Sequence, residues 1–147
     1  MKPFVRVTGV PASGKSFLAT QLARDLAITH LDIAKQPGHL KEPRMAWSFL
    51  RHEMQLAKSA VVETAGTSPY EGGFWSPAEC VTVRCSVARD LQKNRLFRRP
   101  RSVSEPGYIS KMLAIPNPPA GDFEWDGATR IPSDKYAALL ADIKGAT

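Results

Sequence analysis

The chain has 147 residues, which suffices for one globular domain with a single core and is too short for a second. Its formal net charge is +6, which favours acidic or phosphate-bearing partners. Because no apolar run could cross a bilayer and Met1 and Lys2 lead directly into a strand, we expect one cytoplasmic domain over residues 1–147, with no signal peptide and no membrane partner.

The first predicted element is a short strand that begins at Phe4, and the sequence GVPASGKS follows it at residues 9–16. This sequence fits GxxxxGKS, in which glycines let successive backbone N–H groups surround phosphate oxygens. Apolar residues at helical spacing between Phe17 and Leu26 predict a helix directly after it. The order strand, loop, helix therefore predicts a nucleoside triphosphate site.

Within this phosphate loop, Lys15 would reach the β and γ phosphates, and the Ser16 hydroxyl would bind the Mg²⁺ that bridges them. The predicted nucleotide-binding positions of this segment are Gly9, Pro11, Ala12, Ser13, Gly14, Lys15, Ser16 and Phe17.

A second strand is predicted at residues 29–33, with Asp32 near its carboxyl end. In a parallel sheet this end faces the same crevice as the phosphate loop. A carboxylate there can accept the proton of an attacking hydroxyl as the γ-phosphoryl group departs. The alternative is that Asp32 only caps a turn.

A helix is predicted over about residues 44–59, followed by a third strand at residues 60–64. The apolar positions predicted for the helix are Met45, Phe49, Leu50, Leu56 and Ala60. That strand ends in VVETAG, which resembles a Walker B element with Glu63 in place of the usual aspartate. Glu63 would hold a magnesium-bound water. The alternative is an ordinary acidic residue at a strand end.

The fourth predicted strand, residues 80–85, begins and ends with the two cysteines, which an extended backbone holds too far apart for a disulfide. Ser86 would cap the arginine-rich helix that follows, and Pro100 would end it. Residues 89–101 hold six basic residues and one acidic residue. Such a cluster is either a solvated helix face or a site that gathers several phosphates.

Spacing predicts that Arg95, Arg98 and Arg99 share one helical face, where they could bind phosphate oxygens. One of them, Arg98 or Arg99, could neutralise charge on the transferred group. The histidines, His30 among them, show no ligand spacing and are expected at the surface or in turns. The aromatic residues of the loop after the third strand, Tyr70, Phe74 and Trp75, are expected in the core, with base stacking as the alternative.

The rest of the chain predicts a helix around residues 107–113, a proline-rich link, a short strand near residues 123–131 and a last helix after Ser133. Strands that alternate with helices predict a parallel sheet covered on both faces, with ligands at the carboxyl ends of the strands.

Taken together, these residues resemble a small P-loop kinase of the polynucleotide kinase and zeta-toxin type. The resemblance rests on GVPASGKS, on Asp32, and on LQKNRLFRRP with SEPGYISKML, which are similar to the lid helix and the helix behind it. It implies an α/β single-domain P-loop kinase fold, with a parallel five-stranded sheet, helices on both faces and a short arginine-rich lid.

The same resemblance implies ATP and Mg²⁺ as cofactors, bound by Lys15 and Ser16, and Asp32 as general base. It implies that Arg95, Arg98 and Arg99 grip the phosphates. The chain lacks the appended phosphatase of the repair enzymes and has room for only a short lid. A basic kinase of this size also resembles bacteriophage enzymes that phosphorylate 5-hydroxymethyluracil in DNA, which would act in the host cytoplasm.

Three functions therefore remain open. The leading one is an ATP-dependent phosphotransferase that moves the γ-phosphate to a hydroxyl in nucleic acid, with 5-hydroxymethyluracil in DNA as the expected acceptor, because concentrated positive charge suits a polymer with several phosphates. The alternative is a small-molecule or nucleotide kinase with the same chemistry. The third is a non-catalytic nucleotide-binding module.

Overall fold

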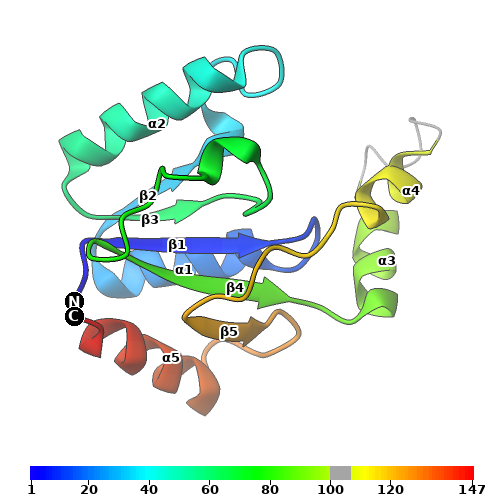
Figure 1. Ribbon diagram of the computed structural model, residues 1–147. Helices are drawn as coiled ribbons and strands as arrows, with labels where there is room; N and C mark the ends of the chain where they lie inside the picture. Colours follow the sequence, from blue (N-terminus) through cyan, green and yellow to red (C-terminus); the bar gives the residue numbers. More distant parts are fainter. Residues whose placement is uncertain (100–106) are drawn as a thin grey trace.

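The structure is a computed structural model that describes residues 1–99 and 107–147. It has three layers, with a parallel five-stranded sheet between helices (Figure 1), as the sequence predicts. The strands, in spatial order β2-β3-β1-β4-β5, are β1 (Phe4–Gly9), β2 (Thr29–Asp32), β3 (Ala60–Glu63), β4 (Cys80–Ser86) and β5 (Phe123–Asp126). The helices are α1 (Lys15–Leu26), α2 (Pro43–Ala57), α3 (Arg89–Phe97), α4 (Tyr108–Leu113) and α5 (Asp134–Gly145), with short 3-10 turns η1 (Ile33–Lys35) and η2 (Pro69–Glu71).

The central strand β1 sets the position of the site. It pairs with β3 on one side and with β4 on the other, and Val7 lies beside both Glu63 and Val83. All five strands run in the same direction, so the segments that follow β1, β2 and β3 leave the sheet at one edge. Helices α3 and α4 lie side by side beyond that edge (Figure 1).

Each face of the sheet has its own apolar core. Helices α1 and α5 cover one face, where Leu18, Leu22 and Ile143 pack against Val5 and Val83. Helix α2 covers the other face over β2 and β3. Strands covered on both sides must be apolar on both sides, which explains why the sequence of β3 reads as a continuous apolar run before Glu63.

The apolar face of α2 agrees with the predicted one at Leu50, which is fully buried, and differs from it at other positions. Phe49 is 43 % exposed and Leu56 is 69 % exposed. The residues that pack on the sheet are Ala46, Trp47, Leu50 and Met54. The spacing of both sets fits a helix, and only the contact with β2 and β3 determines which set is buried.

Two further predictions about element ends were wrong. Ser86 does not cap α3: it is still part of β4, its hydroxyl donates to the Trp125 carbonyl at 3.4 Å, and the N-cap position is Ala88. Strand β5 ends at Asp126, because its carboxylate and carbonyl accept from Ala128 and Thr129 and close a turn. Ser133 does cap α5, by accepting from the Tyr136 N–H.

Cys80 and Cys85 are buried free thiols, as predicted. Within residues 1–99 and 107–147, none of the helices combines the length and the apolar character that a membrane crossing requires.

Candidate active site

The phosphate loop connects β1 to α1 through two residues with left-handed backbone conformations. Ala12 has φ 62° and Gly14 has φ 90°. A side chain at Gly14 would press on the Arg95 guanidinium and on the Gly127 carbonyl, both 3.3 Å from an ideal Cβ. The turn brings the start of α1 to the sheet edge, where its first N–H groups lack helical acceptors and can bind an anion.

Side chains from β4 and α3 hold the outer side of this loop. Gln92 donates to the Pro11 carbonyl at 3.0 Å, Arg95 to the Ala12 carbonyl at 3.1 Å, and the Cys85 thiol to the Ser13 carbonyl at 3.2 Å. Burial raises the pKa of Cys85 to about 11, so it remains a thiol and can donate. Contacts within the protein therefore hold the conformation of the phosphate loop.

Lys15 spans the loop, and its ammonium group donates to the Gly9 carbonyl at 2.9 Å. Burial lowers the pKa of Lys15, and the nearby carboxylates of Glu63 and Asp32 partly counter that shift. The Lys15 ammonium, which these carboxylates only partly balance, therefore lies where the phosphates of a nucleotide would add negative charge.

Glu63 is the most buried carboxylate of the site, with a side chain 3 % exposed. Its two oxygens have different partners: Oε1 accepts from the Ser16 hydroxyl, and Oε2 lies 3.0 Å from His30 Nε2. Burial alone would raise the pKa of Glu63, yet the hydrogen bonds from His30 and Ser16 hold it below its usual value. An ionised carboxylate can only accept, so His30 Nε2 carries the proton and donates.

Asp32 combines both roles that the sequence left open. Its Oδ1 accepts from the Ala34 N–H at 2.9 Å and caps η1, and its side chain also lines the cavity at the phosphate loop. Burial, followed by the proximity of Glu63, raises the pKa of Asp32. A carboxylate with a raised pKa is a stronger proton acceptor than a free one once it is ionised.

The three arginines predicted for the lid do not share one face. Arg95 donates to Gly127 O at 2.8 Å as well as to the phosphate loop, and Arg99 donates to the Tyr108 hydroxyl at 3.3 Å. Arg95 and Arg99 line the cavity; Arg98 is exposed and is not among its lining residues. Arg95 and Arg99, four residues apart, thus face the cavity, whereas Arg98, three residues after Arg95, does not. Pro100, predicted to end this helix, and Arg101, the last basic residue of the segment 89–101, lie outside the described residues.

These groups line one cavity of about 890 Å³. Every predicted nucleotide-binding residue of the loop except Gly9 borders it. The lining residues outside the loop include Asp32, Ala34, His39, Leu40, Glu63, Thr64, Ala65, Arg95, Arg99, Tyr108, Met112 and Gly127.

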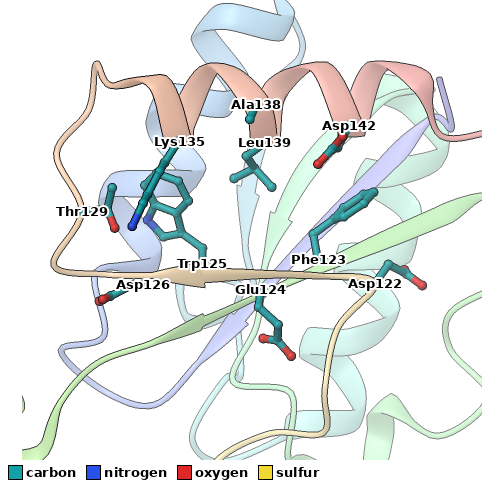
Figure 2. Close-up of a pocket in the computed structure, with 10 residues that line it drawn as sticks. All are labelled: Asp122, Phe123, Glu124, Trp125, Asp126, Thr129, Lys135, Ala138, Leu139 and Asp142. Carbon is teal, nitrogen blue, oxygen red and sulfur yellow. The ribbon is translucent and has the colours of Figure 1, made fainter.

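A separate cavity of about 520 Å³ lies between β5 and α5 (Figure 2). Four carboxylates border it against a single basic residue, Lys135. Figure 2 shows Asp126 at one end and Asp142 on α5 at the other. This charge would repel a triphosphate, so the cavity at the phosphate loop is the candidate active site.

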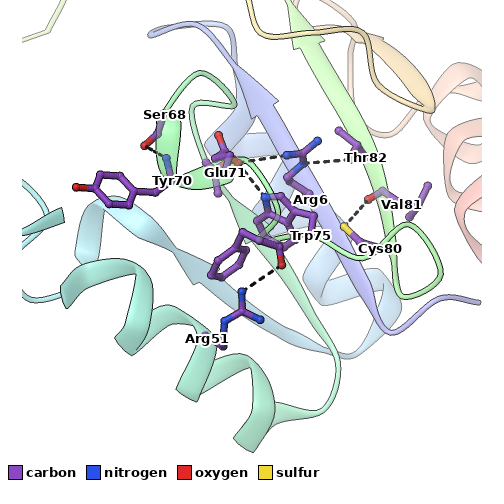
Figure 3. A network of polar contacts seen from close by, with 11 residues as sticks. Arg6, Arg51, Ser68, Tyr70, Glu71, Trp75, Cys80, Val81 and Thr82 are labelled. Atoms are coloured by element: carbon purple, nitrogen blue, oxygen red, sulfur yellow. Dashed lines mark hydrogen bonds and ion pairs between the residues drawn. The ribbon is translucent and has the colours of Figure 1, made fainter. Parts of the chain in front are cut away.

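Of the aromatic residues after β3, Phe74 and Trp75 are partly buried against the core, in a polar and aromatic network (Figure 3). Tyr70 was expected in the core as well, but it is 36 % exposed. Glu71 Oε1 accepts from Arg6, from Trp75 Nε1 at 3.0 Å and from the Thr64 hydroxyl at 2.8 Å. Phe74 packs edge-on against Trp75, and Arg51 lies over its other side. Because Thr64 also lines the active cavity, this network supports one cavity wall.

His30 is the residue of the site that the sequence analysis missed. It was expected in a turn or at the surface, and it lies in β2 with its side chain on Glu63. The available signal was its position two residues before Asp32, because side chains two apart in a strand share a face.

The donors at Ser16, Glu63 and Asp32 are hydroxyl and carboxylate oxygens, which fit Mg²⁺. In the part of the chain that the structure describes, no three His, Cys, Asp or Glu side chains converge as a metal site of their own.

No protein-family model matches the chain, and no curated protein matches it. Solved structures do match over nearly the whole length. The chain is similar to a proposed kinase from Chloroflexus aurantiacus, with a TM-score of 0.71, 16% identity, and coverage of 99% of this chain and 98% of that one.

It is also similar to the APS kinase of Mycobacterium tuberculosis in complex with AMPPNP and APS, with a TM-score of 0.69, 16% identity and coverage of 98% of both chains. A third match is the shikimate kinase of Aquifex aeolicus, with a TM-score of 0.61, 16% identity, and coverage of 97% and 96%. The chain therefore has the fold of the small P-loop kinases.

Proposed function

We propose that the chain is an ATP-dependent kinase that transfers the γ-phosphoryl group to a hydroxyl of a small molecule. One observation carries the proposal: Lys15, the bonded pair of Ser16 and Glu63, and the Asp32 carboxylate all line the same cavity. A nucleotide-binding module without catalysis would need the first two features and not the third.

In this proposal the phosphate loop and the start of α1 bind the triphosphate, and Lys15 exchanges its bond to Gly9 for the β and γ phosphates. Ser16 and Glu63 would hold Mg²⁺, which would neutralise phosphate charge. The acceptor oxygen bonds to the γ-phosphorus, the bond to the β–γ bridging oxygen breaks, and Asp32 takes the hydroxyl proton. ADP is the leaving group.

The comparisons support a small acceptor over nucleic acid. The structures of shared fold include kinases named for shikimate and for APS, and the second was solved with AMPPNP and APS bound. These names support ATP as donor and a small hydroxyl compound or nucleotide as acceptor.

The argument for DNA, including 5-hydroxymethyluracil in DNA, rested on the basic segment at residues 89–101. Three of its arginines are engaged within the protein: Arg89 donates to Leu113 O at 2.8 Å, Arg95 binds the phosphate loop, and Arg99 donates to the Tyr108 hydroxyl at 3.3 Å. Fewer of the guanidinium donors are thus available to a nucleic-acid backbone than the sequence predicts.

The test is transfer of labelled γ-phosphate from ATP to parallel sets of acceptors: polyols and hydroxy acids, nucleosides and nucleotides, plain DNA, and DNA with 5-hydroxymethyluracil. The proposal expects label on a small acceptor, and loss of label in the Lys15→Ala and Asp32→Asn variants. Label that enters DNA far faster than any small compound would contradict it.

A further inference from the structure

We propose that His30 is a positioning residue that fixes the Glu63 carboxylate, so that the Ser16 hydroxyl keeps its lone pairs turned toward the cation site. The inference rests on the proposed function, because it assumes that the cavity binds a metal–nucleotide complex.

Each oxygen of the Glu63 carboxylate accepts from a different donor. Oε1 accepts the Ser16 hydroxyl proton, and Oε2 accepts from His30 Nε2 at 3.0 Å. A carboxylate held at one oxygen can still rotate about its last torsion, whereas one held at both oxygens has a fixed plane. His30 thus supplies the second fixed point.

No other residue takes this position in β2. Asp32 lies beside Glu63 in the strand register, but it is a like charge whose Oδ1 is bonded to Ala34 N. Repulsion from Asp32 would favour turning the Glu63 carboxylate away, and the hydrogen bond from His30 opposes that movement. His30 and Asp32 reach the same face because they are two residues apart in one strand.

The consequence concerns Ser16. A hydroxyl has one proton and two lone pairs. While that proton is donated to Glu63, the lone pairs remain available to a cation on the cavity side. If the carboxylate turns, Ser16 can donate elsewhere and its orientation is lost. Partners that orient metal ligands typically account for about 10–100-fold in metal affinity, and we expect a loss of about tenfold or more without His30.

The test uses the full chain with Mn²⁺ as a paramagnetic probe and AMPPNP, which the enzyme cannot turn over. Free Mn²⁺ is measured by electron paramagnetic resonance during titration. His30→Ala and His30→Leu both remove the donor, and the leucine variant keeps volume if the alanine variant folds poorly. His30→Gln can place an amide N–H where Nε2 lies. His52→Ala, at an exposed position of α2, is the matched control.

We expect weaker Mn²⁺ binding in both donor-less variants, recovery in His30→Gln, and no change in His52→Ala. In steady-state assays the half-saturating Mg²⁺ concentration should rise by a similar factor, with kcat at saturating Mg²⁺ nearly kept. Unchanged Mn²⁺ binding by folded His30→Leu overturns the inference alone. Failure of the unmodified chain to bind Mn²⁺ with AMPPNP overturns the proposed function as well.

Discussion

Single side chains in the cavity have environments that suit phosphoryl transfer. Lys15 is a cation whose pKa is lowered by burial, and Asp32 is a carboxylate whose pKa is raised by burial and by Glu63. Each would be relieved by the reaction partner it is proposed to meet: negative phosphate for Lys15 and a proton for Asp32.

Replacing Lys15 by alanine should abolish transfer and leave the fold intact, because it removes charge at the phosphates and only one hydrogen bond, to Gly9. Lys144→Ala, at an exposed position of α5, is the matched control and should keep normal turnover. Transfer rates and circular dichroism measure both effects. Normal turnover in Lys15→Ala would remove Lys15 from the mechanism.

Asp32→Asn retains an oxygen that can accept from Ala34 N, but an amide cannot take a proton. We expect kcat to fall by at least roughly a hundredfold, with ATP affinity nearly unchanged. The unmodified enzyme should lose activity as the pH falls through the raised pKa of Asp32, because the base becomes protonated. A variant that retains the same acidic limb and a normal kcat would show that Asp32 only caps the turn.

Asp32→Asn should lower kcat, but it should raise the stability of the fold at neutral pH. A raised folded pKa means that ionised Asp32 destabilises the fold at neutral pH, and this cost disappears below the pKa of the unfolded chain. Asp32→Asn should therefore have a higher free energy of unfolding at pH 7, and the difference should shrink toward pH 3. Denaturant unfolding at several pH values measures it. A less stable variant at pH 7 would contradict the environment described for Asp32.

At the scale of elements, α3 acts as a support for the phosphate loop through Gln92 and Arg95. Arg95 connects the phosphate loop to Gly127, which directly follows β5. One of its terminal nitrogens donates to the Ala12 carbonyl and the other to the Gly127 carbonyl. A side chain at Gly127 would collide with the Ser13 carbonyl, so these two turns are packed directly together.

Arg95→Ala should lower the free energy of unfolding by about 1–3 kcal/mol, because two backbone carbonyls lose their donor. ATP affinity should fall with it. Arg95→Lys should restore only part, since an ammonium cannot bond both carbonyls in the same planar geometry. Arg98→Ala, on the exposed side, should stay within about 0.5 kcal/mol. Equal effects of Arg95→Ala and Arg98→Ala would contradict the support role.

The elements also show what local sequence can and cannot predict. The phosphate loop and the ends of β2 and β3 were predictable from local sequence. An apolar run, a glycine turn and a side chain that caps a turn each depend on only a few neighbouring residues. The buried face of α2 was not, since Phe49 and Met54 fit a helix equally well until the sheet selects one side. The contacts of Arg95 with Ala12 and of His30 with Glu63 join residues 83 and 33 apart, and no local pattern encodes them.

At the scale of the whole molecule, the strand order brings distant groups to one sheet edge. Because β1 lies between β3 and β4, the phosphate loop receives Glu63 from one side and Cys85 from the other. Helices α3 and α4 close the cavity beyond that edge, with Tyr108 and Met112 in its lining. The position of the candidate active site is thus a consequence of the parallel order of the sheet.

The net charge of +6 leads to a prediction about salt. A small acceptor makes few ionic contacts, so kcat/KM for it should change little between low and moderate salt. Binding to a DNA backbone would weaken steeply, with a slope of log affinity against log salt of about −0.9 per phosphate contact in a duplex. A steep slope of about −3 to −4 for productive transfer to DNA would favour the nucleic-acid acceptor over the small one.

The central claim is that the cavity couples ATP cleavage to formation of a phosphate ester on a small hydroxyl compound. Phosphorus-31 NMR of reactions with ATP, Mg²⁺ and mixtures of small acceptors tests this directly, because it distinguishes a phosphate monoester from inorganic phosphate. We predict a monoester signal that grows in equal amount with ADP and is lost in Asp32→Asn. ADP formed only with inorganic phosphate in every mixture, or a phosphate ester formed only on DNA, would contradict the account.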